Sequence, residues 1–214
     1  MITDIDNATK IAEFLLQIKA VKLQPQNPFT WSSGWKSPIY CDNRKTLSYP
    51  VIRTFIRQSF TEQILENYGK PDIIAGVATG GIPHGVLIAQ ELGIPFIYVR
   101  SSTKGHGLNN QVEGAFESDQ NVVVVEDLIS TGGSAIKAVE ALRAEKLNVK
   151  GVVAIFSYGF PKAKEEFETA KCPFSVLCNY EVLIEKALDQ GAIAKNDIES
   201  LREWRLAPDT WKKN

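Results

Sequence analysis

The sequence lacks long apolar segments, paired cysteines and a signal for secretion. Its longest apolar runs, at residues 94–99, 122–125 and 152–156, are far shorter than the roughly 18 residues that a membrane-spanning helix needs. The N-terminus MITDIDNATK has no basic region followed by an apolar stretch, which argues against a signal peptide. The three cysteines include no C-x-x-C pair, a pattern typical of a reducing compartment rather than of a disulfide framework or a zinc cluster. We therefore expect a cytoplasmic protein with no membrane partner.

An excess of charge of either sign is also absent. The 24 Lys and Arg residues and 25 Asp and Glu residues leave a net charge of −1, and no basic patch stands out. Nucleic-acid binding as the main function is therefore not expected. Because 44% of the 214 residues are hydrophobic, the chain can bury a sizeable core, and we expect a single domain over residues 1–214.

Apolar patterning predicts an alternation of strands and helices. Unalternating β-rich runs, typical of parallel strands covered on both faces, lie at residues 72–77, 96–99, 122–125 and 152–156. Helical spacing predicts helices at residues 6–20, 52–69, 134–146, 162–170, 180–188 and 197–204. The fold class is therefore α/β, with a parallel sheet flanked by helices. Residues 21–50, which hold four prolines, should be irregular or short-stranded.

Residues 101–120 (SSTKGHGLNNQVEGAFESDQ) show neither a helical nor a strand pattern and contain three glycines. Structureless loops beyond about 12–15 residues are uncommon in compact domains unless they serve a function. We interpret this segment as a mobile lid. A disordered surface insertion is the alternative.

The segment VVVVEDLISTGGSA, residues 122–135, is the strongest functional motif. Its valines predict a central strand that ends in two carboxylates, and a Ser/Thr/Gly turn then opens the next helix. Ligands of open α/β sheets bind at the carboxyl ends of the strands, which is where this motif lies. Backbone N–H groups of residues 130–134, at the positive end of that helix, would hold a phosphate, and the hydroxyls of Ser130, Thr131 and Ser134 add donors.

The two acids of this motif, Glu126 and Asp127, narrow the choice of ligand. They would repel a nearby phosphate unless they bind something else on the same ligand, such as ribose hydroxyls or a magnesium ion. Phosphate and sugar together indicate a phosphosugar, and an acid pair that merely caps the next helix is the alternative. No Walker A, G-x-G-x-x-G, HExxH or GxSxG motif is present, which disfavours kinases, dehydrogenases, zinc proteases and serine hydrolases.

Four apolar residues, two acids and a Ser/Thr-Gly turn resemble the signature of the type I phosphoribosyltransferase family. Three further segments, FTWSSGWKSPIYCDNRK (29–45), GVATGGIPHG (76–85) and YVRSSTKGHG (98–107), make the chain similar to the orotate phosphoribosyltransferases over nearly its whole length. The resemblance implies a Rossmann-like parallel-sheet core over about residues 51–180, with a small hood formed by about residues 1–50 and the C-terminal tail.

The same resemblance implies an activity and partners. Members of this family transfer 5-phosphoribose from its 1-pyrophosphate donor (PRPP) to orotate, which gives orotidine 5′-monophosphate and pyrophosphate for UMP biosynthesis. It further implies Mg²⁺, held mainly through PRPP or pyrophosphate rather than by protein ligands, and a homodimer with active sites shared across the interface. A phosphoribosyltransferase for another nucleobase, disfavoured by residues 29–45, and a non-catalytic PRPP-sensing regulator remain as alternatives.

Residue roles follow from the resemblance as expectations. Lys104, His106 and Asp127 are the expected catalytic residues, with Arg100, Lys104 and His106 reaching the pyrophosphate in the partner's site. The full set expected to bind PRPP is Arg100, Lys104, His106, Glu126, Asp127, Leu128, Ile129, Ser130, Thr131, Gly132, Gly133 and Ser134. Ser130 is also expected near orotate. Without the resemblance, Lys104 and His106 would be interpreted as solvated loop residues.

The sequence departs from the best-known family pattern where some members carry basic residues. Lysine or arginine of those members is replaced here by Ser32, Gly80, Ser101 and Tyr158. The carboxylate of orotate must then be bound in another way, and Lys36, Arg44 or backbone donors of the hood are candidates.

Three other features have a structural interpretation, and two of them have a functional one as well. Residues 79–81 (TGG) are expected to approach pyrophosphate through their backbone, or else to form an ordinary strand-to-helix turn. We expect His84 to be structural. Cys41, beside the hood motif, is either sensitive to oxidation or, more commonly for cysteine, an inert buried thiol.

Overall fold

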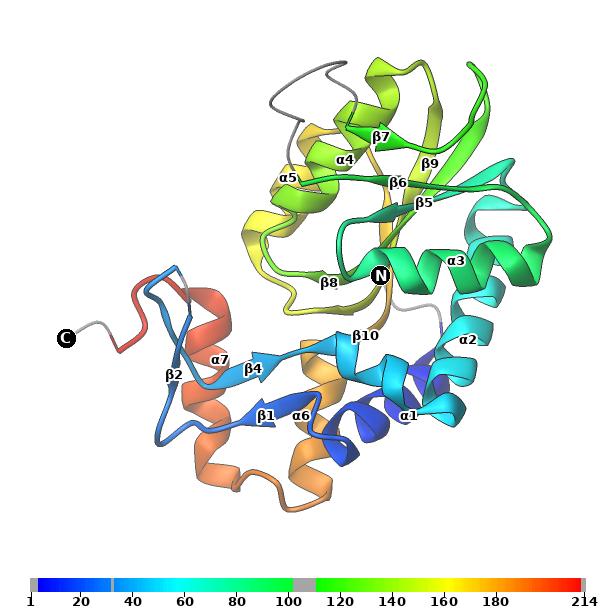
Figure 1. Cartoon of the computed structure of the whole chain (residues 1–214). Helices are drawn as coiled ribbons and strands as arrows, with labels where there is room; N and C mark the ends of the chain where they lie inside the picture. The colour runs from blue at the N-terminus through cyan, green and yellow to red at the C-terminus, as the bar shows by residue number, and fades with distance from the viewer. Residues whose placement is uncertain (1–3, 32, 102–110, 213–214) are drawn as a thin grey trace.

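The computed structural model describes residues 4–31, 33–101 and 111–212. Its centre is a six-stranded sheet in the order β10–β9–β8–β5–β6–β7 (Figure 1). Neighbouring strands run parallel from β10 to β6, and only the edge strand β7 is antiparallel. The strands are β5 (Ile73–Val77), β6 (Phe96–Val99), β7 (Val112–Glu113), β8 (Asn121–Ile129), β9 (Asn148–Ser157) and β10 (Phe174–Asn179). The predicted α/β class is confirmed.

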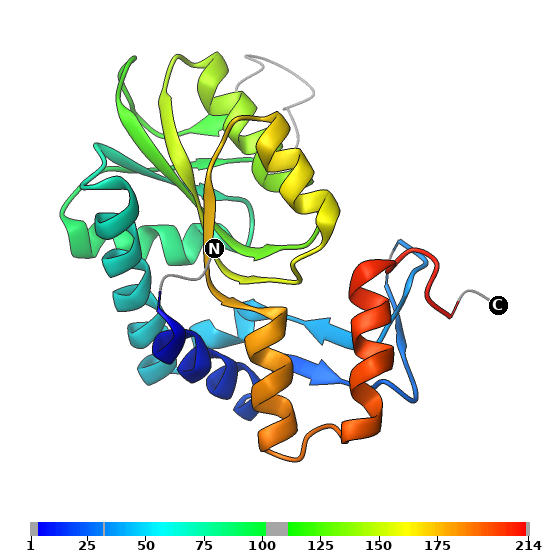
Figure 2. The same ribbon diagram turned by 180° about the vertical axis from the view of Figure 1, so that it is seen from behind.

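Helices cover both faces of the sheet, as Figures 1 and 2 show from opposite sides. One face packs against α2 (Pro50–Tyr68) and α3 (Gly81–Leu92), and the other against α4 (Gly133–Ala144) and α5 (Pro161–Thr169). Successive valines of β8 alternate between these two cores, and all four are fully buried. Burial on both faces explains why the strands read as continuous apolar runs.

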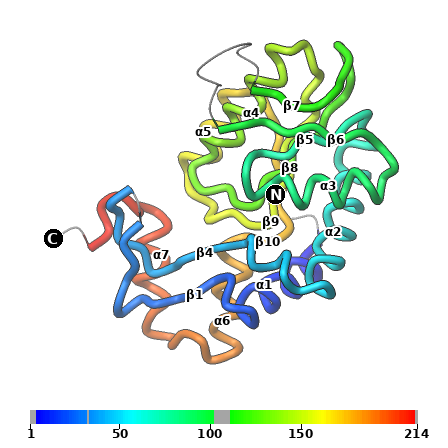
Figure 3. The backbone as a smooth tube through the Cα atoms, viewed as in Figure 1, coloured from blue at the N-terminus to red at the C-terminus, as the bar shows by residue number. Residues whose placement is uncertain are grey.

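The remaining elements form a lobe below the sheet in Figure 1, which we call the hood. Two antiparallel pairs, β1 (Val21–Leu23) with β4 (Ile39–Cys41) and β2 (Phe29–Thr30) with β3 (Lys36–Ser37), lie there beside three helices. These are α1 (Ile5–Gln17), α6 (Tyr180–Asp189) and α7 (Ile198–Leu206). Figure 3 traces the chain from β4 into α2 and back from β10 into α6, so both ends of the sequence contribute to the hood.

Two short helices and one buried indole complete the hood. The 3₁₀ helix η1 (Asn43–Ser48) connects β4 to α2, and η2 (Lys195–Asp197) precedes α7. Trp204 of α7 is fully buried, and its indole N–H donates to the carbonyl oxygen of Lys36 at 3.2 Å. The C-terminal helix is thereby fixed to the β2–β3 ribbon.

Several elements differ from the expectations. The edge strand β10 was not predicted, because Ser175 and Asn179 limit its apolar run to residues 176–178. Residues 102–110 of the expected lid lie outside the described residues, but the expectation was wrong further on, since Val112 is buried in β7 against β6. Within the described ranges, no helix has the length and apolarity to cross a membrane.

Candidate active site

Two adjoining cavities lie at the carboxyl edge of the sheet, where β8 ends. The acidic cavity, about 390 Å³, is lined by Asp42, Arg44, Gly80, Glu126, Asp127 and Ser134 among others. The aromatic cavity, about 680 Å³, is lined by Trp31, Trp35, Tyr40, Ser130, Tyr158 and Lys162 among others. Cys41 and Leu128 line both, so the two spaces meet between the hood and the sheet.

Glu126 is enclosed by protein although it lines the acidic cavity. Only 5% of it is exposed, and its carboxyl oxygens accept hydrogen bonds from the Ser134 hydroxyl and from the backbone N–H of Asp127, both at 3.0 Å. Burial, reinforced by the charge of Asp127, raises the pKa of Glu126 to about 9. The raised pKa favours the protonated form of Glu126 at neutral pH, and in that form Glu126 can donate a hydrogen bond as well as accept one.

Asp127 packs directly against the turn that precedes α3. A Cβ atom added to Gly80 would overlap the carboxylate of Asp127, and one added to Gly81 would overlap the carbonyl oxygen of Val125. Glycine at both positions lets the start of α3 approach β8 this closely. Thr79 and Gly80 line the acidic cavity, and Gly80 also leaves room for the Asp127 carboxylate.

Asn43 joins the hood to the strand end and was missed in the sequence. It is 1% exposed, and its amide nitrogen donates to the backbone carbonyl of Asp127 at 2.6 Å. Its amide oxygen accepts from the Cys41 thiol at 3.2 Å, and its carbonyl accepts from Thr46 at 2.6 Å. In the sequence, only its position inside the segment 29–45 could have marked Asn43 as part of the site. This network fixes the position of Asp127 relative to the hood.

The turn after β8 has the form expected of an anion cradle. Gly132 is the N-cap of α4 with a left-handed φ of 87°, which glycine adopts without strain. Among the described residues, the backbone N–H groups of 130–134 have no hydrogen-bond acceptor. Ser130 and Thr131 line the aromatic cavity, whereas Ser134 lines the acidic one. Free N–H groups at a helix start suit a phosphate, so the cradle lies between the two spaces.

Aromatic rings build the wall of the second cavity. Trp31 stacks with Trp35 at a ring separation of 6.5 Å and contacts Tyr158 at 5.2 Å, while its indole N–H donates to the carbonyl of Ile39 at 3.1 Å. Burial raises the pKa of the Tyr158 hydroxyl well above its ordinary value, so this ring is neutral. Lys162, from the first turn of α5, is the one charged side chain among the described residues that line this cavity.

Three of the expected basic residues are engaged by other side chains of this chain. Arg100 lines neither cavity, and its guanidinium is 3.6 Å from the carboxylate of Glu113 on β7. Lys36 also lies outside both, where its ammonium donates to the Thr30 hydroxyl at 3.0 Å. Arg44 does line the acidic cavity but is engaged by Asp42 at 2.7 Å. Lys104, His106 and Ser32 lie outside the described residues.

His84 is buried in the core rather than exposed to either cavity. It is 1% exposed, and burial lowers the pKa of its imidazole to about 4. One ring nitrogen lies 3.4 Å from the Thr46 hydroxyl. These surroundings favour the structural role that we expected.

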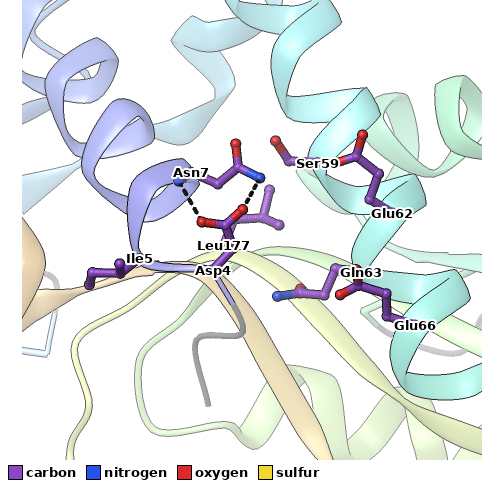
Figure 4. Close-up of a pocket in the computed structure, with 8 residues that line it drawn as sticks. All are labelled: Asp4, Ile5, Asn7, Ser59, Glu62, Gln63, Glu66 and Leu177. Carbon is purple, nitrogen blue, oxygen red and sulfur yellow. Dashed lines mark hydrogen bonds between the residues drawn. The ribbon is translucent and has the colours of Figure 1, made fainter.

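A third cavity, about 370 Å³, lies between the start of α1 and α2 (Figure 4). Asp4, Glu62 and Glu66 give it an acidic lining, and none of its lining residues is shared with the two cavities above. Asp4 is occupied as the N-cap of α1, where it accepts from the backbone N–H groups of Asp6 and Asn7 at 2.9 and 3.0 Å. We assign this cavity no part in the site.

Comparison with known proteins agrees with this geometry. A family model described as "Phosphoribosyl transferase domain" matches residues 52–187. The orotate phosphoribosyltransferase of Bacteroides fragilis is 57% identical over 201 residues, which cover 94% of this chain and 95% of that protein. That of Listeria innocua is 50% identical over 204 residues, covering 95% and 98%. The crystal structure of the Aeropyrum pernix orotate phosphoribosyltransferase matches with a TM-score of 0.74 at 29% identity, over 82% of this chain and 97% of that one. Strand β8, its acid pair and its glycine turn all fall within the matched residues, and the chain belongs to the orotate phosphoribosyltransferase family.

Proposed function

We propose that this chain transfers 5-phosphoribose from PRPP to orotate, forming orotidine 5′-monophosphate and pyrophosphate in pyrimidine biosynthesis. The observation that carries the proposal is the meeting of the acidic and aromatic cavities at Cys41 and Leu128, directly beside the anion cradle. One space suits a polyhydroxylated phosphosugar and the other a flat base. The names and the high identity of the relatives support the same substrates.

The chemistry assigns distinct tasks to the described residues. The bond between N1 of orotate and C1 of the ribose forms as the C1–oxygen bond to pyrophosphate breaks. The proton of N1 passes to the departing pyrophosphate or to water. Positive charge develops on the ribose during this step, and the Asp127 carboxylate at the cavity wall stabilises it. Glu126 and Asp127 hydrogen-bond the ribose hydroxyls, while the N–H groups of residues 130–134 hold the 5-phosphate.

A protonated Glu126 also reduces repulsion of the substrate. PRPP carries two phosphate-containing groups, and two ionised carboxylates would oppose its binding. Because burial favours the protonated form of Glu126 near pH 7, the pair repels the phosphates less than two ionised carboxylates would. The site can thus bind ribose through both residues while presenting a single carboxylate to the developing cation.

Mg²⁺ fits this cavity as a companion of the substrate. The oxygen donors of Glu126, Asp127 and Ser134 line it, and oxygen is what this hard cation prefers. Within the ranges described, no group of three or more His, Cys, Asp or Glu side chains is arranged to hold a metal by itself. We therefore propose that Mg²⁺ is held mainly through the pyrophosphate, whose charge it neutralises when bound.

The proposal includes a homodimer, with residues of one chain completing the partner's site. Arg100 supports this arrangement, because it binds Glu113 and lines neither cavity of its own chain. Lys104 and His106 are proposed to act with it on the pyrophosphate as it departs. We further propose a cytoplasmic location, in keeping with three cysteines that are all free thiols.

The test is the loss of orotate absorbance on mixing the protein with PRPP and Mg²⁺, with uracil, hypoxanthine and adenine as parallel acceptors. We expect consumption of orotate alone, abolished by chelation and reduced at least a hundredfold in Asp127→Ala and Lys104→Ala. Turnover of a different base would reject orotate as the substrate. Binding of PRPP without turnover of any base would favour the regulator instead.

A further inference from the structure

The aromatic cavity contains an unexplained positive charge. Lys162 is the second residue of α5, after Pro161, and its exposed side chain has no ion-pair partner among the described residues. Two positions along the same helix, Lys164 pairs with Glu168 at 3.8 Å. A cation in the first turn of a helix is disfavoured by the helix dipole. Lys162 is therefore placed where neither an ion pair nor the helix accounts for it.

The other basic residues nearby, Arg44 and Lys36, do not place a charge in the aromatic cavity. Arg44 is held by Asp42 on the far side, in the acidic cavity, and Lys36 donates to Thr30 outside both cavities. The acids Asp42, Glu126 and Asp127 also belong to the acidic cavity. A ligand in the aromatic cavity thus has acids on one side and the Lys162 ammonium within reach on the other.

Orotate fits this division of charge. It is a flat pyrimidine with a carboxylate at C6, next to the N1 atom that reacts, and it differs from uracil only in that carboxylate. The rings of Trp31, Trp35 and Tyr158 supply apolar contact for a base but no charge. Discrimination against uracil therefore needs a group that binds the carboxylate, since binding to the rings alone would be nearly equal. Lys162 is the one charged side chain among the described residues that line this cavity.

We propose that Lys162 binds the carboxylate of orotate and so selects orotate over uracil. The inference rests on the function proposed above and adds a specificity residue to it. Lys162, at the start of α5, takes the place of the arginine that some members carry at the position of Tyr158, which lines the same cavity. Its charge-assisted contact is lost whenever the base lacks the carboxylate.

The test compares Lys162→Gln with Lys162→Arg, which keeps the charge, and with Lys164→Gln, which removes a charge from the same helix outside the cavity. Steady-state kinetics should show KM for orotate raised about ten- to hundredfold in Lys162→Gln, the loss expected for one charged hydrogen bond. KM for PRPP should stay within about twofold, Lys162→Arg should recover most of the loss, and Lys164→Gln should behave as the wild type.

Binding of two nucleotides isolates the carboxylate from the phosphate. Orotidine 5′-monophosphate and uridine 5′-monophosphate share the phosphate and ribose, so titration calorimetry of both measures what the carboxylate adds. We expect Lys162→Gln to weaken only the orotidine nucleotide. Equal weakening of both would assign Lys162 to the 5-phosphate and overturn the proposal, as would no change in either. A wild-type protein that binds orotidine 5′-monophosphate but does not turn over orotate would reject the proposed function, while the affinity ratio would still decide the role of Lys162.

Discussion

Replacement of Glu126 by glutamine should stabilise the folded chain, and increasingly so as the pH rises. Glu126 is 5% exposed, and burial raises the pKa of its carboxyl from 4.5 to about 9. Between these values the folded state keeps a proton that the unfolded chain has released. Each pH unit in this range then lowers the stability by about 1.4 kcal/mol. Glutamine is neutral, close in shape to the protonated acid and free of this dependence.

The magnitude follows from the slope alone. The stability difference between Glu126→Gln and the wild type should widen by about 3 kcal/mol from pH 6 to pH 8, as an upper bound for one proton. Both contacts of Glu126 can survive the change. The glutamine oxygen can accept from the Asp127 N–H, and the glutamine NH2 group can donate to the Ser134 hydroxyl oxygen. Below pH 4.5 both states of the wild type hold the proton, and the two proteins should converge.

Urea unfolding at a series of pH values, at one fixed protein concentration, measures the difference. Glu62→Gln, which alters an exposed glutamate of α2, is the matched control and should run parallel to the wild type. If the curve of Glu126→Gln were also parallel to the wild type from pH 6 to 8, Glu126 would be ionised in the folded protein. The reasoning from its burial would then be refuted.

Three further perturbations test the surroundings of Asp127 and the buried core. Gly80→Ala should lower kcat at least tenfold and destabilise the fold by about 1–3 kcal/mol, because its Cβ overlaps the Asp127 carboxylate. Gly133→Ala, whose Cβ meets nothing within 4 Å, is the control for the stability assay alone, because Gly133 belongs to the anion cradle. Asn43→Ala removes the 2.6 Å hydrogen bond to the Asp127 carbonyl and should cost about 1–3 kcal/mol in thermal unfolding, with a fall in kcat; an unchanged melting temperature would contradict this. Burial lowers the pKa of His84 to about 4, so between pH 6.5 and 4 only the unfolded chain takes up a proton at this residue. The free energy of unfolding of the wild type should therefore fall by up to about 1.4 kcal/mol per pH unit as the pH falls through this range. His84→Gln should lack this loss of stability.

The central sheet could be predicted because its strands are buried on both faces. Strands β5, β6, β8 and β9 read as unbroken apolar runs, and each was found within a few residues of its predicted place. Edge strands carry weaker signals, since one side of their backbone has no neighbour in the sheet and polar residues are tolerated. The polar residues of β10 and the two-residue length of β7 therefore escaped the pattern.

The site could be predicted in part, for a similar reason. The acid pair, the glycine turn and the residues around them are contiguous in sequence, so one motif revealed them. Asn43 and Lys162 lie far in sequence from the motif that they adjoin. Asn43 donates a hydrogen bond to the Asp127 carbonyl, and Lys162 lines the aromatic cavity together with Ser130 and Thr131. No local pattern marks such residues, because only the folded chain brings the hood, β8 and α5 together.

The geometry of strand β8 explains how one short motif serves two purposes. The ladder continues past the valines, with Glu126 opposite Ala154 of β9, so the pleat turns neighbouring side chains to opposite faces. Glu126 is turned into the protein and loses its charge, whereas Asp127 faces the turn of α3 and remains partly exposed in the acidic cavity. An insertion of one residue in this strand would exchange the two environments. The order of the two acids therefore matters, and exchanging them by the double substitution Glu126→Asp and Asp127→Glu should abolish turnover even though composition and net charge are unchanged.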